Sequence, residues 1–518
     1  MLTLLAGCGA GNGDGAQGPA PTQTASGNSG APKAERSPAP PDKPAAPGSS
    51  EPSSPATSRV PQEKTGDEIG AASARVPAPA WHGDAAPVEV LVVRAGAQGG
   101  NEFATLDAAL EAAGRRGPAG RLIRVHGMHT PTKEPAVNLS GTHGHPLIVE
   151  GAGPGSGIDM SKAPAVPLKS FQGPNCLAVN HAEYVVVRNL TCRNNRSGAG
   201  ITVYASSHVR ISNTKVSDVK NAGINSLGTA KRRNRQILLD GNEVTGTSTR
   251  HSPAHRPQEA DWSPAIVAHH TDGVTITGNE VYENFGEGID CLLSTDCTVS
   301  RNTVRDNWSV NVYVDNASQV SIDRNFITST GKKTFERNSR PAAGIQLAQE
   351  SYRSFVPLKN VSITHNVVSG SAAALSYYPY ECDTRENAAE ACGMRDVTVA
   401  HNTFARPPRL AKVSEALVVV GGTPDERTVD NLSLVNNVLA APSHGLLQIG
   451  SRSGVRFDTN CWSNRPPRQI DARATVGDPR FRNADSRNPD DYQVGSGSPC
   501  TRTPAKAGRL GMKTFGAL

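Results

Sequence analysis

Large apolar side chains are scarce in this sequence of 518 residues: aromatic residues make up 4% of it, and there are 5 Met. No stretch is apolar enough to cross a membrane as a helix. No CxxC pair occurs, which argues against a zinc site. The net charge of +6 is a mild basic excess, which tolerates acidic partners without requiring nucleic acid. We therefore expect no nucleic-acid partner.

The N-terminal segment predicts a tethered protein. The sequence LAGC, which ends at Cys8, resembles the lipobox of bacterial lipoproteins. That resemblance implies a truncated signal over residues 1–8, a lipid on Cys8 and attachment to a membrane; an ordinary soluble terminus is the alternative. Residues 9–87 are rich in Pro, Ala, Gly and Ser and hold almost no large apolar residue, so we expect a disordered linker there.

A repeat dominates the rest of the chain. VTITGNEVYENFGEGIDCLLSTD (274–296) is followed directly by a second copy (297–319), which aligns Asn279 with Asn302, 23 residues on. Each copy holds three short β-rich runs separated by turn residues, and such a unit cannot bury its apolar face alone. The repeat therefore predicts one coil of a parallel β-helix, with about ten coils in all.

An asparagine marks the same turn in most coils. The pattern V-x-I-x-x-N-x-V places it at positions 242, 279, 302, 325, 366, 402, 437 and 460. Leu190 and Thr214 hold the position in two earlier coils. We expect a stacked ladder of side-chain amides in which the asparagines themselves adopt the left-handed backbone of the turn.

The two ends of the repeat region carry a family resemblance. VEVLVVRAG, from Val88, predicts a strand, and Leu106 and Leu110 recur at helical spacing after Thr105, a plausible N-cap. With SGTHGHPLIVEGAGPGSGID (140–159) and the late DPRF and GSP elements, this resembles secreted proteins of the pectate-lyase-like superfamily. The resemblance implies a right-handed parallel β-helix over 88–500, a tail over 501–518, and a substrate on the outer face of the IDCLL strand. We expect a monomer.

Eight cysteines remain once Cys8 is set aside, and an even number favours disulfides. Their order suggests local pairs, although spacing alone leaves the connectivity open: Cys176 with Cys192, Cys291 with Cys297, Cys382 with Cys392, and Cys461 with Cys500. This favours an oxidising, extracytoplasmic location.

Strand alternation predicts which side chains face outward. If Ile289 and Cys291 face the core, Asp290 faces out. Applied to neighbouring coils, alternation predicts one exposed column of four residues: His269, Asp290, Tyr313 and Gln346. Further side chains are expected beside it: Asn225, His270, Glu287, Asp315, Glu350, Ser376 and Tyr378. The longer coils insert loops here that are rich in basic residues: Lys231, Arg232, Arg233, Arg250, His251, His255, Arg256, Lys332, Lys333, Arg337, Arg340 and Arg353.

Basic loops around a polar groove suit an acidic polysaccharide, so we expect a polysaccharide lyase acting on a uronate polymer. Calcium, which prefers carboxylate oxygens, is the cofactor expected at Glu287, Asp290 and Asp315. The candidates for catalytic residues are His269, His270, Asp290, Tyr313, Lys332 and Arg353. The candidates for substrate binding are Asn225, Asp315, Gln346, Glu350 and Tyr378.

Two alternatives stay open. A glycoside hydrolase would use paired carboxylates, for which Asp290 and Asp315 lie on adjacent coils. A β-helix without catalysis would bind glycans or serve as a structural element of the cell envelope.

Overall fold

The structure is a computed structural model, and it describes residues 87–167, 173–255, 262–350, 352, 356–378, 393–421, 429–442, 445–450, 454–466 and 470–502. The chain divides into two compact units, and all of these residues lie in the unit that contains Gly66–Leu518. Cys8, Arg256, Arg353, Cys382 and Cys392, each named above, lie outside the described residues. No helix within the described part is long and apolar enough to cross a membrane.

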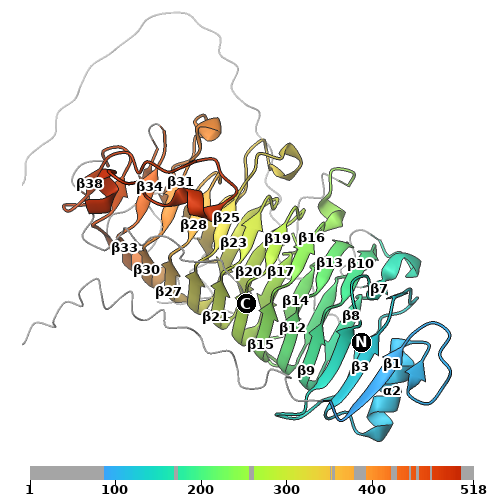
Figure 1. Cartoon of the computed structure of the whole chain (residues 1–518). Helices are drawn as coiled ribbons and strands as arrows, with labels where there is room; N and C mark the ends of the chain where they lie inside the picture. The colour runs from blue at the N-terminus through green and yellow to red at the C-terminus, as the bar shows by residue number, and fades with distance from the viewer. Residues whose placement is uncertain are drawn as a thin grey trace, which may run out of the picture. The chain divides into compact units, whose positions relative to one another are not determined.

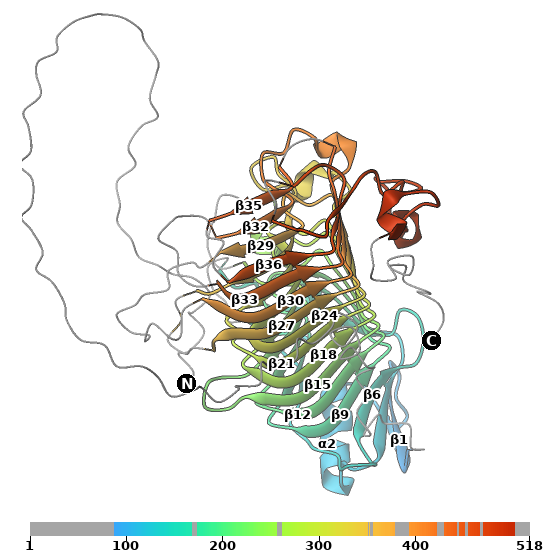
Figure 2. The same cartoon turned by 90° about the vertical axis from the view of Figure 1, so that its left-hand side faces the viewer.

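Three parallel sheets wind around one axis, and the chain passes through sheets A, B and C once in each coil (Figures 1 and 2). The strands of sheet A are β2 (Glu102–Phe103), β1 (Glu89–Val93), β3 (Arg121–Val125), β6 (Leu147–Gly151), β9 (Glu183–Arg188), β12 (Ser207–Ser212), β15 (Asn234–Asp240), β18 (Thr271–Thr277), β21 (Thr295–Ser300), β24 (Ser318–Asp323), β27 (Leu358–Thr364), β30 (Met394–Ala400), β33 (Val429–Val435) and β36 (Val455–Asp458).

Sheets B and C complete each coil. The strands of sheet B are β4 (Met128–His129), β7 (Gly157–Asp159), β10 (Thr191–Asn195), β13 (Lys215–Val219), β16 (Glu243–Thr245), β19 (Glu280–Tyr282), β22 (Thr303–Arg305), β25 (Phe326–Thr328), β28 (Val367–Ser369), β31 (Thr403–Ala405), β34 (Val438–Ala440), β37 (Cys461–Trp462) and β38 (Thr475–Val476). The strands of sheet C are β5 (Ala136–Val137), β8 (Leu177–Asn180), β11 (Ile201–Tyr204), β14 (Ile224–Leu227), β17 (Ile266–His269), β20 (Ile289–Leu292), β23 (Val310–Asp315), β26 (Ala343–Ala348), β29 (Leu375–Tyr378), β32 (Val418–Val420) and β35 (Leu447–Ile449).

The double repeat is the clearest coil pair, as predicted. β18, β19 and β20 form one coil and β21, β22 and β23 the next, with Val281 opposite Val304 and Ile289 opposite Val312. The inward residues of successive coils join one continuous apolar core. Ile289 and Cys291 belong to that core, which confirms the predicted facing of β20.

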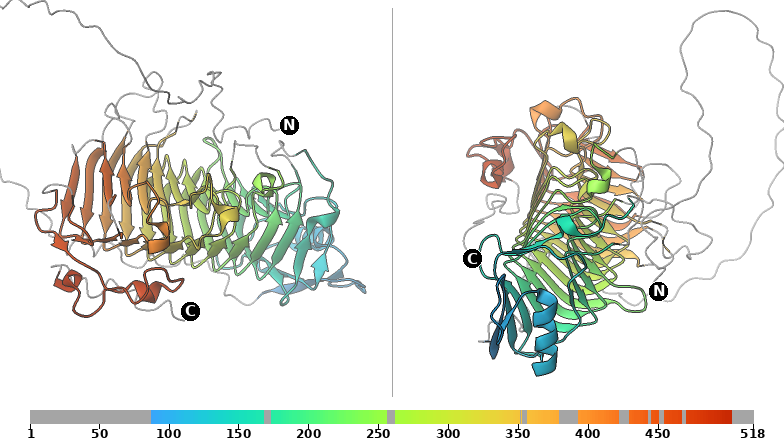
Figure 3. Two further views of the ribbon diagram at one scale, coloured as in Figure 1. Left: turned by 90° about the horizontal axis from the view of Figure 1, so that it is seen from above. Right: turned by 90° about the vertical axis from the view of Figure 1, so that its right-hand side faces the viewer.

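Within the described ranges, one helix, the blue coil in the right-hand view of Figure 3, and six short 3-10 turns accompany the strands. α2 (Leu106–Arg116) begins after Thr105, whose Oγ1 accepts from the backbone N–H of Ala108, and its buried face packs at the first coils. The expected N-cap is confirmed. The 3-10 turns are η1 (Met160–Lys162), η2 (Thr249–His251), η3 (Lys333–Phe335), η4 (Pro408–Leu410), η5 (Pro489–Tyr492) and η6 (Pro499–Arg502).

The asparagine ladder is confirmed between sheets A and B. In Asn302, the backbone N–H and Nδ2 both donate to Oδ1 of Asn325 at 2.9 Å, and Nδ2 also donates to a backbone carbonyl. The same pattern runs from Asn242 to Asn460, where the last amide donates to Oδ2 of Asp471.

The expected backbone of the ladder asparagines is wrong. The left-handed residue is the one before each asparagine: Arg301 and Arg324 have φ of 55°, and Gly241 and Gly278 hold the same place in two other coils. The ladder amide has to point into the coil to reach its neighbours, and the turn is made one residue earlier.

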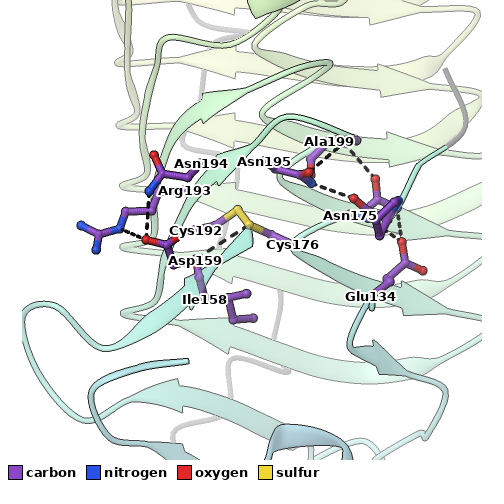
Figure 4. The surroundings of a disulfide bond; sticks show 12 residues. Glu134, Ile158, Asp159, Asn175, Cys176, Cys192, Arg193, Asn194, Asn195 and Ala199 are labelled. Carbon is purple, nitrogen blue, oxygen red and sulfur yellow. Dashed lines mark hydrogen bonds and ion pairs between the residues drawn. A yellow bond between two sulfur atoms is a disulfide. The ribbon is translucent and has the colours of Figure 1, made fainter. Parts of the chain in front are cut away.

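Three of the four predicted disulfides are present: Cys176–Cys192, Cys291–Cys297 and Cys461–Cys500. The first lies inside an early coil (Figure 4), close to an outer ion pair between Arg193 and Asp159.

Candidate functional site

The outer face of sheet C carries the predicted column, with one change of register. Asp290 lies opposite Tyr313, and Tyr313 lies opposite Gln346 on the next strand. On the neighbouring strand β17, the residue paired with Asp290 is Val267, whereas His269 pairs with Leu292. The prediction that His269 belongs to this column is therefore wrong. Outward positions recur every second residue, so alternation gives the facing of a side chain but not its level along the strand.

The column is also buried, not exposed as predicted. Asp290, Tyr313 and Gln346 are 2%, 4% and 8% exposed, and Asp315 is 2% exposed. Tyr352 and Val356, from the insertion after β26, pack against outward apolar side chains of β17 and β20. Insertions that cover an outer face cannot be read from strand alternation.

Four carboxyl groups gather here, and we call Glu287, Asp290, Asp315 and Glu350 the carboxylate cluster. Burial, with the charge of Glu350, raises the pKa of Glu287 to about 8. Burial raises the pKa of Asp290 well above its usual range, and repulsion from the other three carboxylates adds to it. Burial and the charge of Glu350 also raise the pKa of Asp315 well above its usual range.

Two tyrosines supply hydrogen bonds to the cluster. The Tyr313 hydroxyl donates to Oε1 of Glu350 at 2.7 Å. The Tyr352 hydroxyl contacts both Oδ2 of Asp315 and Oε2 of Glu350. Oδ1 of Asp290 and Oδ1 of Asp315 are buried without a hydrogen-bond partner among the described residues.

This arrangement keeps protons at neutral pH. Buried carboxylates that repel one another and lack a compensating cation are stabilised by protonation. Glu287, Asp290 and Asp315 therefore keep their protons at pH values where an ordinary carboxyl group is ionised. Proton donation and proton acceptance are both within the chemistry of the cluster.

The two predicted histidines have a different charge environment from that of the carboxylate cluster. The rings of His269 and His270 are 4.5 Å apart at the end of β17. Burial, the second imidazole and Arg233 lower the pKa of His269 to about 3, and burial and Arg233 lower that of His270 to about 4. Both rings are neutral at pH 7, and their catalytic role stays a prediction.

Several of the predicted basic residues in the described loops form ion pairs. Lys332 pairs with Glu283, at the turn after β19, and Arg340 pairs with Glu415 at 2.6 Å. The guanidinium of Arg337 lies 4.0 Å from the ring centre of Trp262, and its charge opposes the rise in the pKa of Glu287. Trp262 and Tyr352 thus border the cluster, although the sequence analysis did not select them. Their place in the inserted loops was the signal that could have identified them.

The other predicted side chains are spread along the same sheet. Asn225 faces outward on β14, and its Oδ1 is buried without a hydrogen-bond partner among the described residues. Ser376 on β29 donates to Oε1 of Gln346 at 3.4 Å. Tyr378 ends β29, and burial raises the pKa of its hydroxyl.

Calcium was expected at Glu287, Asp290 and Asp315. The donor set is all oxygen, which suits calcium, but within the described ranges no three acidic, histidine or cysteine side chains are placed to hold a metal ion together. The geometry does not fit a bound ion, and calcium stays a prediction.

Comparison with known proteins identifies the class of protein. Residues 259–461 match the family model described as a right handed beta helix region. With the parallel coils on either side of that range, the match shows a right-handed parallel β-helix protein, as the resemblance implied. No curated protein matches the sequence.

Solved structures with the same architecture match at low identity. The A-module of a mannuronan C-5 epimerase from Azotobacter vinelandii has 13% identity and a TM-score of 0.48, covering 72% of this chain and 95% of that one. An alginate lyase from Paenibacillus has 13% identity and a TM-score of 0.43, covering 64% and 98%. A pectate lyase has 14% identity and a TM-score of 0.43, covering 73% and 80%.

Proposed function

We propose that this β-helix protein is carbohydrate-active and hydrolyses glycosidic bonds in a polysaccharide with Asp290 and Asp315. The observation that carries the proposal is the carboxylate cluster on the outer face of sheet C, whose raised pKa values provide an acid at neutral pH. Glycoside hydrolysis needs one protonated and one ionised carboxyl group on either side of the bond.

The surroundings assign the two roles. Burial and repulsion from three carboxylates raise the pKa of Asp290, and no hydrogen bond from a described residue opposes that rise. Burial and Glu350 raise the pKa of Asp315 as well, but the hydrogen bond from Tyr352 opposes the rise, so Asp315 is the carboxyl group assigned to ionise first. Asp290 then gives its proton to the leaving oxygen as the bond from the anomeric carbon breaks. Asp315 takes a proton from the water whose oxygen bonds that carbon. The substrate has to replace the present contacts of Tyr352 to reach them.

The strand geometry predicts the stereochemistry. Asp290 and Asp315 stand on adjacent strands, two residues out of register, so their Cα atoms are on the order of 8 Å apart. Carboxyl groups with about that separation leave room for a water molecule and invert the anomeric centre. We expect the first product to carry the inverted configuration, which NMR of a fresh digest measures.

A lyase acting on a uronate polymer is the second candidate. Arg337 beside Glu287 and Trp262 supports it, because a guanidinium next to an aromatic ring suits the carboxylate of an acidic sugar. Elimination would leave an unsaturated product that absorbs ultraviolet light, and hydrolysis would not. Any calcium requirement would appear as a loss of activity with a chelator that calcium restores.

The deciding experiment is a digestion of neutral and uronate polysaccharides, followed by reducing ends and ultraviolet absorbance. Hydrolysis predicts new reducing ends without absorbance, and Asp290→Asn and Asp315→Asn each lower kcat at least about a hundredfold. The control is Asp240→Asn, at an ion pair with Arg210 on sheet A. Binding of a polysaccharide without cleavage by the wild type would favour the non-catalytic alternative.

We also propose an extracytoplasmic location, supported by the three disulfides. Anchoring through Cys8 predicts that the full chain sediments with membranes and that Cys8→Ala releases it; equal partitioning of both would contradict the anchor.

A further inference from the structure

A second polar depression lies at the corner where sheet C passes into sheet A. It is a cleft of about 600 Å3, and no member of the carboxylate cluster lines it. Its lining comes from the first residues of β9, β12, β15, β18 and β21, the strands labelled in Figure 2, and from the turns before them; it includes His181, His208, Arg233, Arg235, Asp272 and Asp296.

A column of left-handed residues forms one wall. Each of these strands has such a residue near its start: Tyr184, His208, Gln236, Gly273 and Asp296 all have positive φ. Later coils have Gln319, Asn360, Asp396 and Asn431 there, and Asn and Asp are types that adopt this backbone with little strain. Tyr184 and His208 are the two exceptions that place an aromatic ring at this position.

The two exceptions form an aromatic platform beside the cleft. The rings of Tyr184 and His208 stack at 4.5 Å with an interplanar angle of 18°, and His143 meets Tyr184 edge-on. Burial lowers the pKa of His208, so its ring is uncharged at neutral pH. The next positions along the column are Gln236 and Gly273, and the side-chain amide of Gln236 lies where a side chain on Gly273 would begin.

The cleft holds charged groups of both signs, with two arginines and the three carboxylates of Glu183, Asp272 and Asp296. Arg233 pairs with Asp272 at 2.7 Å and also donates to the carbonyl of Leu293, which fixes one wall. Arg235 and Asp296 are exposed and carry opposite charges. A flat uncharged ring beside hydrogen-bonding side chains of both charge signs suits a neutral sugar, whose ring has apolar C–H faces and a rim of hydroxyl groups.

We propose that this cleft is a carbohydrate-binding site separate from the carboxylate cluster, in which a neutral sugar unit lies against His208 with the side-chain amide of Gln236 beside it. This inference rests on the proposed function only in taking the ligand to be a carbohydrate. The cleft would hold the chain of a polysaccharide on the corner of the β-helix while the cluster on sheet C acts on another part of it.

The test fills the cleft without disturbing the coil. Gly273→Asn places a side chain in it and pushes the Gln236 amide aside, because a Cβ there would lie 2.5 Å from Nε2 of Gln236; Asn is a residue type that this column already accommodates. Gly278→Asn is the matched control: it has a similar φ of +65°, and the heavy atom nearest to its added Cβ would be the backbone nitrogen of Gly241, 3.9 Å away. His208→Ala removes the platform.

Affinity electrophoresis of the full chain in gels with neutral polysaccharides measures the effect. We expect wild type and Gly278→Asn to be retarded by the same polymer, and Gly273→Asn and His208→Ala to bind it about tenfold more weakly. Asp290→Asn should bind as the wild type, so loss of hydrolysis alone leaves this inference standing. No retardation of the wild type on any neutral polymer, or equal binding by all variants, would overturn it.

Discussion

Asp290 and Glu287 link folding stability to pH. Their folded pKa values are raised, so the native state binds more protons than the unfolded chain between the two pKa values. For Glu287 this window runs from 4.5 to about 8, and stability falls as pH rises through it. Each retained proton contributes a slope of about 1.4 kcal/mol per pH unit.

Asp290→Asn removes one such proton. We therefore expect the unfolding free energy of the variant to decline less steeply with pH, by up to about 1.4 kcal/mol per unit, in urea titrations at several pH values. Asp240→Asn, at the Arg210 ion pair, is the comparison. Parallel curves for wild type and Asp290→Asn would show that the carboxyl is ionised throughout.

Tyr352 opposes the rise that burial and Glu350 cause in the pKa of Asp315. Tyr352→Phe removes the hydroxyl that contacts Oδ2 of Asp315, and the pKa of that carboxyl should rise further. If Asp315 is the base, the acid limb of kcat/KM then moves to higher pH, and stability falls by about 1–3 kcal/mol. Tyr204→Phe, on β11 of the same sheet, should leave the profile in place. A loss of stability without movement of the limb would reduce Tyr352 to a structural role.

At the residue scale, the sequence predicted which side of the sheet a side chain faces. It did not predict the level of the residue along the strand or the burial of its side chain. Alternation identified the core side of Ile289 and Cys291 and the outer side of Asp290. The level of His269 depends on where β17 begins pairing, and the covering of this outer face depends on Tyr352, from an insertion elsewhere in the chain, which packs with Val267 and Leu292. Both are long-range outcomes without a local signal.

At the scale of the element, the ladder turn is the unit that fixes coil spacing. Asn325 accepts from two groups of Asn302 and donates to Oδ1 of Asn366, all buried. Asn325→Ala leaves the amide and backbone N–H of Asn302 without their acceptor, which should cost about 2–4 kcal/mol of unfolding free energy. Ser321→Ala, on the same coil, should stay within about 0.5 kcal/mol. Equal effects in chemical denaturation would mean that the ladder adds no stability.

The repeat made this element predictable because one residue type recurs at one position. The backbone of the turn was assigned to the wrong residue for the same reason: Gly241 and Gly278 occupy the left-handed position in two coils, but Arg301 and Arg324 occupy it in others, so no single type marks it.

For the whole molecule, the ends of the solenoid are its weak points, because a terminal coil has a neighbour on one side only. The closing segment, which follows β37, is linked to that strand by the disulfide Cys461–Cys500, with a sequence separation of 39 residues. An early coil is linked by Cys176–Cys192, with a separation of 16 residues. Chain-entropy arguments give about 4 and about 3 kcal/mol for loops of these sizes.

Position adds to the difference in loop length. Cys461 and Cys500 lie with Val438 and with Phe481 of the closing segment, so freeing residue 500 exposes the last core layer as well. We expect Cys461→Ala/Cys500→Ala to unfold at lower denaturant than Cys176→Ala/Cys192→Ala and to lose amide protection first in the coils nearest β37. Protection lost evenly along the coils would instead indicate that the β-helix unfolds as one cooperative unit, with no weak end.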